Sequence, residues 1–91
     1  MSTAIEKARN LGPVMGAELR TLGIDTLEAL REVGWQEAWD RLCDHYPVRT
    51  HLLCGYALLG AEMDLDCMKL PDALKVKVKA HKRARQSMRA R

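Results

Sequence analysis

The chain has 91 residues and a formal net charge of +3, with 47% apolar and 30% charged residues. This length suits one domain, and this apolar content argues against a wholly disordered chain. The longest apolar run, residues 52–61, is too short to cross a bilayer, which needs ~20 residues.

Glycine and proline residues divide the first third of the chain into short helices. Thr3 and Glu6 match a capping box, in which each side chain bonds a backbone N–H of the other residue. Pro13 suits the first turn of a helix, where its missing N–H costs nothing, and Gly23 suits the position just after a helix. These signals predict three helices, over residues 3–9, 13–22 and 27–33, the last one capped by Asp25 or Thr26.

The middle of the chain has the clearest helical periodicity, and two helices are predicted there, over residues 35–46 and about 50–63. In the first, Trp35 and Trp39 begin an apolar stripe and are predicted to anchor the core. The second is apolar nearly all round, which predicts a central buried helix. Four acids of the predicted helices are interpreted as solvated: Glu28 and Glu32 in the helix over residues 27–33, and Asp40 and Asp44 in the helix over residues 35–46.

The C-terminal segment is the most basic part of the chain. Residues 75–91 hold eight Lys and Arg and no acid, whereas residues 1–74 hold seven Lys and Arg and twelve Asp and Glu. Lysine alternates with valine over residues 75–79 as in a strand, but no partner strand is visible, so a helix that begins near Pro71 and frays before Arg91 is predicted. An acidic body with a basic end is typical of proteins that contact nucleic acid or another polyanion.

Several short segments stand in a specific order along the chain: Asn-Leu-Gly-Pro at 10–13, Ala-Glu-Leu at 17–19, Gly-Ile-Asp-Thr-Leu-Glu at 23–28, residues 38–42, the Leu-rich helix around Tyr56, and Leu70-Pro71. Their order resembles the C-terminal domain of the TfoX/Sxy family of bacterial competence regulators, over about residues 5–80. The resemblance implies an all-α fold of helix-hairpin-helix or SAM-like type, with a link to DNA uptake and transcription regulation. The prediction is therefore an all-α domain of five or six short helices.

The expected organisation is a TfoX C-terminal-like helical domain at residues 1–80, followed by a partly frayed basic tail at residues 81–91. Two-domain family members carry a separate N-terminal domain, so a stand-alone copy of the C-terminal domain is expected. No secretory signal is visible, and three cysteines without a Cys-x-x-Cys pair indicate reduced thiols. A cytoplasmic protein is therefore predicted.

Two segments are candidates for binding nucleic acid. In helix-hairpin-helix proteins, backbone N–H groups of a glycine-rich turn face a phosphate, and the matching residues are Asn10, Leu11 and Gly12. Asparagine tolerates the left-handed conformation, although the turn could also simply join two packed helices. The stronger candidate is the basic helix, whose cations would hold phosphates without reading bases. Its candidate residues are Lys75, Lys77, Lys79, Lys82, Arg83 and Arg85.

Other chemistry has little support in the sequence. Cys43, His45, His51 and Cys54 lack zinc-finger spacing, and no catalytic motif is present, so no metal, no cofactor and no enzyme are predicted. Two functions remain: a regulatory module that associates weakly with DNA, or a protein-interaction module, as a homodimer or adaptor, without direct DNA contact. Neither a membrane nor a small-molecule substrate is indicated.

Overall fold

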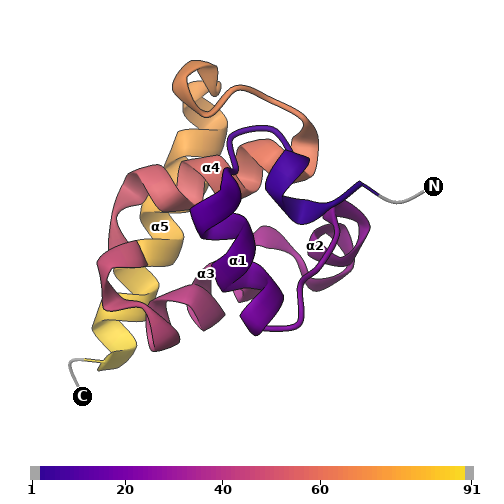
Figure 1. Cartoon of the computed structure of the whole chain (residues 1–91). Coiled ribbons are helices and arrows are strands. Elements are labelled where there is room, and N and C mark those ends of the chain that lie inside the picture. Colours follow the sequence, from indigo (N-terminus) through magenta and orange to yellow (C-terminus); the bar gives the residue numbers. More distant parts are fainter. Residues whose placement is uncertain (1–2, 90–91) are drawn as a thin grey trace.

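The computed structural model describes residues 3–89 and builds them from five α-helices and three short 3-10 helices (Figure 1). The all-α fold class is therefore confirmed. No helix in this part of the chain is both long and apolar enough to cross a membrane. The elements are η1 (Ile5–Lys7), α1 (Pro13–Thr21), α2 (Leu27–Val33), α3 (Trp35–His45), η2 (Pro47–Thr50), α4 (Leu52–Met63), η3 (Cys67–Lys69) and α5 (Asp72–Arg89).

Local capping signals place the ends of α1, α2 and α3 as predicted. Pro13 begins α1, and Thr26 caps α2 by accepting a hydrogen bond from the Ala29 N–H on its side-chain oxygen, at 3.0 Å. Gly34 has φ of 90° and joins α2 directly to α3. Residues with a Cβ rarely adopt a positive φ of this size, whereas glycine does so readily, and glycine therefore permits the sharp turn between the two helices.

The N-terminal segment is not the helix that the capping box predicts, so the prediction of a helix over residues 3–9 is wrong. The Thr3 N–H donates to Glu28 Oε1 at 2.9 Å instead of binding within its own segment. The Ile5 N–H donates to the Asp25 carbonyl at 3.0 Å, and the Leu27 N–H donates to the Thr3 carbonyl at 2.9 Å. These bonds hold the segment extended against the start of α2, and only the single 3-10 turn η1 follows.

Protonation of Glu28 should loosen this N-terminal segment. The hydrogen bond from the Thr3 N–H lowers the pKa of Glu28 below 4.5. The carboxylate therefore stabilises the fold above its unfolded pKa, and this contribution is lost as pH falls through the lowered folded pKa. Glu28→Gln should make the melting temperature less sensitive to acid, as the pH falls below the ordinary pKa range of glutamate. Glu32→Gln, on the same helix, is the control, and equal acid sensitivity of Glu28→Gln and wild type would contradict the prediction.

The core forms where α3, α4 and α5 cross. Trp35 and Trp39 are 5% and 2% exposed, which confirms them as core anchors. Gly55 of α4 lets the helices approach closely, since a Cβ there would lie 2.6 Å from Val78 Cγ1 and 2.7 Å from the Trp39 ring. Leu58, one turn further along α4, is fully buried. The central position predicted for this helix is therefore confirmed.

Candidate nucleic-acid interface

α5 is an amphipathic helix whose inner face packs on the body of the fold. Residues 75–79, which alternate lysine and valine, are helical, as predicted. Val78 is fully buried, and His81 and Arg85 lie partly buried on the same face. Met88, which follows Arg85 by three residues, is 77% exposed. The buried contact thus ends before the last turn of α5.

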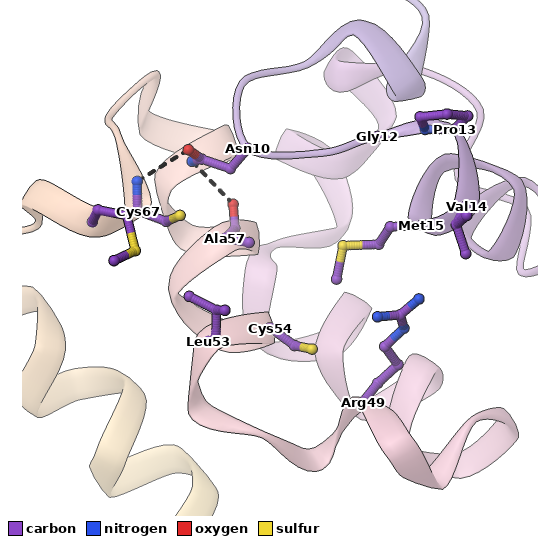
Figure 2. A pocket seen from close by; sticks show the side chains of 11 residues that line it. Asn10, Gly12, Pro13, Val14, Met15, Arg49, Leu53, Cys54, Ala57 and Cys67 are labelled. Atoms are coloured by element: carbon purple, nitrogen blue, oxygen red, sulfur yellow. Dashed lines mark hydrogen bonds between the residues drawn. The ribbon is translucent and has the colours of Figure 1, made fainter.

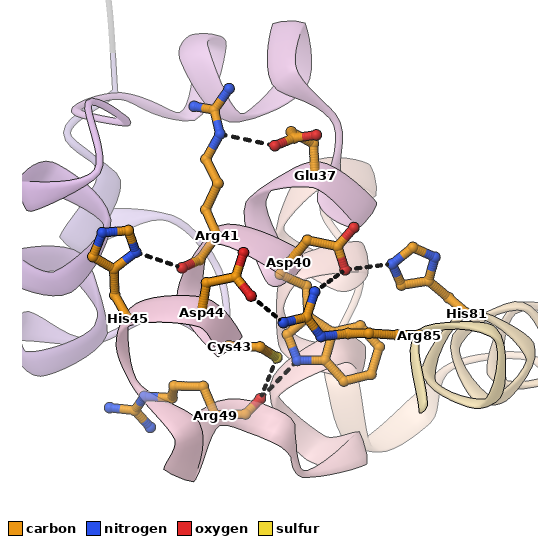
Figure 3. Close-up of polar contacts among 10 residues, drawn as sticks. Glu37, Asp40, Arg41, Cys43, Asp44, His45, Arg49, His81 and Arg85 are labelled. Atoms are coloured by element: carbon orange, nitrogen blue, oxygen red, sulfur yellow. Dashed lines mark hydrogen bonds and ion pairs between the residues drawn. The ribbon is translucent and has the colours of Figure 1, made fainter. Parts of the chain in front are cut away.

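Two acids of α3 fix the inner face of α5 through an ion-pair cluster, the α3–α5 latch (Asp40, Asp44, His81 and Arg85; Figure 3). His81 Nε2 lies 2.9 Å from Asp40 Oδ1, and Arg85 Nη1 lies 3.2 Å from the same oxygen. Arg85 also pairs with Asp44. The His81 ring stands edge-on to Trp35, with 5.5 Å between ring centroids. The interpretation of Asp40 and Asp44 as merely solvated acids is therefore wrong.

One flank of α5 carries cations without acidic partners. We call Lys75, Lys79, Lys82 and Arg83 the basic flank, because their spacing of i, i+4, i+7 and i+8 places them along one side of the helix. Lys79 and Arg83 are exposed, and the other two are partly buried. Among residues 3–89, none of the four forms an ion pair. Lys77 lies on the opposite flank, and Arg85 points to the acids of the latch.

The side chain of Asn10 ties its turn to two other segments (Figure 2). Asn10 has φ of 72°, which confirms that asparagine takes the left-handed conformation there. Its Nδ2 donates to the Leu65 carbonyl at 2.7 Å and lies 3.5 Å from the Ala57 carbonyl. Its Oδ1 accepts from the Cys67 N–H at 3.0 Å. The amide therefore bridges the turn, α4 and the start of η3.

The other two residues of the turn also have places in the fold. Leu11 is 8% exposed and belongs to the core. Gly12 precedes α1 as its N-cap with an extended backbone, and Pro13, which follows, has no N–H to offer a phosphate. The three residues thus have structural roles as joints between packed elements, and phosphate binding by the turn stays a prediction.

All three cysteines are free thiols. Cys43 is buried, its thiol donates to the Arg49 carbonyl at 3.6 Å, and burial raises its pKa. Burial likewise raises the pKa of Cys67, which is only partly covered. Across the described residues, no three His, Cys, Asp or Glu side chains are grouped so as to hold a metal ion.

The fold and its contacts define a small all-α domain with a hairpin turn and a cationic terminal helix. The family model of the TfoX C-terminal domain matches residues 1–82, and the chain belongs to that family, which is a regulatory-type domain. The crystal structure of an uncharacterised protein from Listeria monocytogenes is similar, with a TM-score of 0.86 and 26% identity over 92% of this chain and 94% of that chain. A search of the curated proteins finds no match.

Sequence reasoning missed the latch, although a signal for it exists. Asp40 and Asp44 are four residues apart on α3, and His81 and Arg85 are four residues apart on α5. Side chains with this spacing share one face of a helix, so two acids on one helix match two bases on another. Matching the spacings of opposite charges between predicted helices could therefore have indicated this contact.

Proposed function

We propose that this domain is a non-enzymatic regulatory module that associates with DNA weakly and without sequence preference. The observation that supports this proposal is the basic flank, a row of cations without acidic partners in the described part of the chain. The row spans nine helical residues from Lys75 to Arg83, a rise of about 12 Å. Duplex DNA carries one negative charge per ~1.7 Å of axis, so several phosphates lie within reach of this row.

The latch supports the same proposal by removing competing charge. The α3 acids that contact α5 are bound to His81 and Arg85, on the inner face of the helix. The basic flank therefore turns away from the two acids of the latch. No Phe, Trp or Tyr follows Tyr56, and the His81 ring of α5 packs against Trp35 and Trp39, so α5 offers no free ring on which an unpaired base could stack. Contacts between the cations of the basic flank and phosphates would position the protein on the backbone of a duplex without reading its sequence.

Duplex binding should depend on the basic flank and on salt. The test is fluorescence anisotropy of a labelled duplex with the full chain and with a flank variant, Lys79→Gln, Lys82→Gln and Arg83→Gln. Each lost phosphate contact reduces the slope of log affinity against log salt by about 0.9, so the flank variant should lose about 2–3 from this slope. Its affinity at low salt should fall at least tenfold.

A second variant with the same loss of charge serves as the control. Lys7→Gln, Arg9→Gln and Lys69→Gln remove three cations near the Asn10 turn and η3. This variant should bind the duplex as the wild type does. If only this control variant lost duplex affinity, DNA binding would be assigned to the turn at residues 10–12 instead of the basic flank. An absence of duplex binding by the wild type at low salt would overturn the proposal.

A further inference from the structure

An apolar trough runs across α4 on the side where α1 begins. Its first hollow, of about 380 Å³, lies between the start of α1, α4 and η3 (Figure 2). A second hollow, of about 570 Å³, continues past the start of α4 toward α5. The two hollows share Arg49, Leu53 and Cys54 and form one surface, which we call the α4 trough.

The α4 trough gathers apolar side chains that face solvent. Seven large apolar side chains in the described residues are exposed, and four of them line this trough: Val14 at 67%, Val48 at 64%, Leu53 at 54% and Met68 at 73%. Exposed apolar side chains that gather in one hollow make it a candidate binding site, in contrast to single scattered residues. Met15 and Met68, both in the first hollow, have flexible side chains that can adapt to an occupant.

The charge around the α4 trough specifies the occupant. Arg49, His51 and Lys82 line it, and no acid does. The Arg49 guanidinium is neutralised by Glu18, with Nε 2.7 Å from Oε1 and Nη2 3.0 Å from Oε2. Lys82, by contrast, has no acidic partner within residues 3–89. The end of the trough at α5 is therefore cationic.

The opposite end of the α4 trough has a different character. There Asp66 precedes η3 and its carboxylate accepts the Met68 N–H at 2.9 Å. The trough thus runs from an end with an acid nearby to an end at which Lys82 has no acidic partner among the described residues. A helix carries partial negative charge at its C-terminus, so a helical occupant fits best with that end over Lys82.

We propose that the α4 trough binds an acidic amphipathic helix of a partner protein. Large apolar side chains of the partner helix would cover Val14, Leu53 and Met68, and the carboxylates of that helix would lie at the α5 end of the trough, near Lys82. This is the helix-in-groove mode of recognition, in which apolar anchors give affinity and flanking charges give orientation. The proposal shares Lys82 with the basic flank, but its main contacts come from α1, α4 and η3, so Leu53→Ser tests it separately from DNA binding.

The experiment is a selection from a random peptide display library on the full chain, with counter-selection on Leu53→Ser. Enriched peptides should combine apolar residues at helical spacing with Asp or Glu toward the C-terminal end. A synthetic peptide of the enriched sequence should then bind at least tenfold more weakly to Leu53→Ser, since an exposed leucine becomes covered in the complex. Lys82→Gln should weaken binding several-fold and reduce its dependence on salt.

Val76→Ser is the matched control, since Val76 is 62% exposed on α5 and lies outside both hollows. It should bind the peptide as the wild type does, and circular dichroism checks that each variant stays helical. Enrichment of basic peptides, or no enrichment, would overturn the proposal. Sedimentation velocity decides the rival occupant: self-association of the wild type that Leu53→Ser abolishes would assign the trough to a second copy of the chain instead.

Discussion

Trp39→Ala is expected to destabilise the domain by about 3–5 kcal/mol, the usual cost of deleting a large buried ring. Trp39 is 2% exposed and lies where three helices meet. Its ring packs against Gly55 of α4, and its centroid lies 5.9 Å from the centroid of the His81 ring of α5. Its indole Nε1 donates to the Arg49 carbonyl at 2.7 Å and so fixes η2 as well. Urea unfolding followed by circular dichroism measures the change.

A conservative variant at the same position separates the ring from its hydrogen bond. Trp39→Phe keeps one aromatic ring in the core, and it removes the indole donor together with part of the ring surface that packs on Gly55. The Arg49 carbonyl would still accept from the Cys43 thiol, so the expected loss is about 1–2 kcal/mol. Domains of this size are stable by about 5–15 kcal/mol, so Trp39→Ala should leave a measurable transition at low urea. Equal losses in the two variants would show that the hydrogen bond, and not ring packing, dominates.

The elements that could be predicted from the sequence are those fixed by neighbouring residues. The bounds of α2 follow from Thr26 and Gly34, and the beginning of α1 follows from Pro13. The N-terminal segment could not be predicted in this way. Its hydrogen bonds join Thr3 to Glu28 and to the start of α2, more than 20 residues away. A capping pattern describes only hydrogen bonds between neighbouring residues, whereas the Thr3 and Ile5 N–H groups donate to acceptors on Glu28 and Asp25.

The same division applies to the candidate interface. The basic flank could be predicted because helical spacing alone places Lys75, Lys79, Lys82 and Arg83 along one side of a helix. The latch was missed, because Asp40 and His81 are 41 residues apart, and only a comparison of charge spacings between the two helices indicates that they meet. The result is a division of charge within one helix, in which the inner bases hold the fold and the outer ones face solvent.

Asn10→Ala is expected to destabilise the domain by about 2–4 kcal/mol. The substitution leaves the Leu65 carbonyl and the Cys67 N–H without their partner, in a partly buried place. It also forces alanine into the left-handed conformation at φ of 72°, which costs about 1–2 kcal/mol. Gly60 lies directly beside the Asn10 amide, and a Cβ at this position would lie 2.5 Å from Asn10 Nδ2. The space beside the amide therefore admits no side chain at residue 60.

Asn10→Gly is the matched variant, because it removes the same hydrogen bonds but accepts the left-handed conformation. It should be about 1 kcal/mol more stable than Asn10→Ala, and urea unfolding of both separates the two contributions. Equal stability of the two variants would show that the backbone conformation adds nothing to the loss of stability.

Asn10→Gly also tests the turn as a phosphate site under conditions in which the variant is folded. Duplex binding equal to that of the wild type would give the Asn10 side chain a structural role alone, whereas weaker binding with an intact basic flank would make the turn a second phosphate contact.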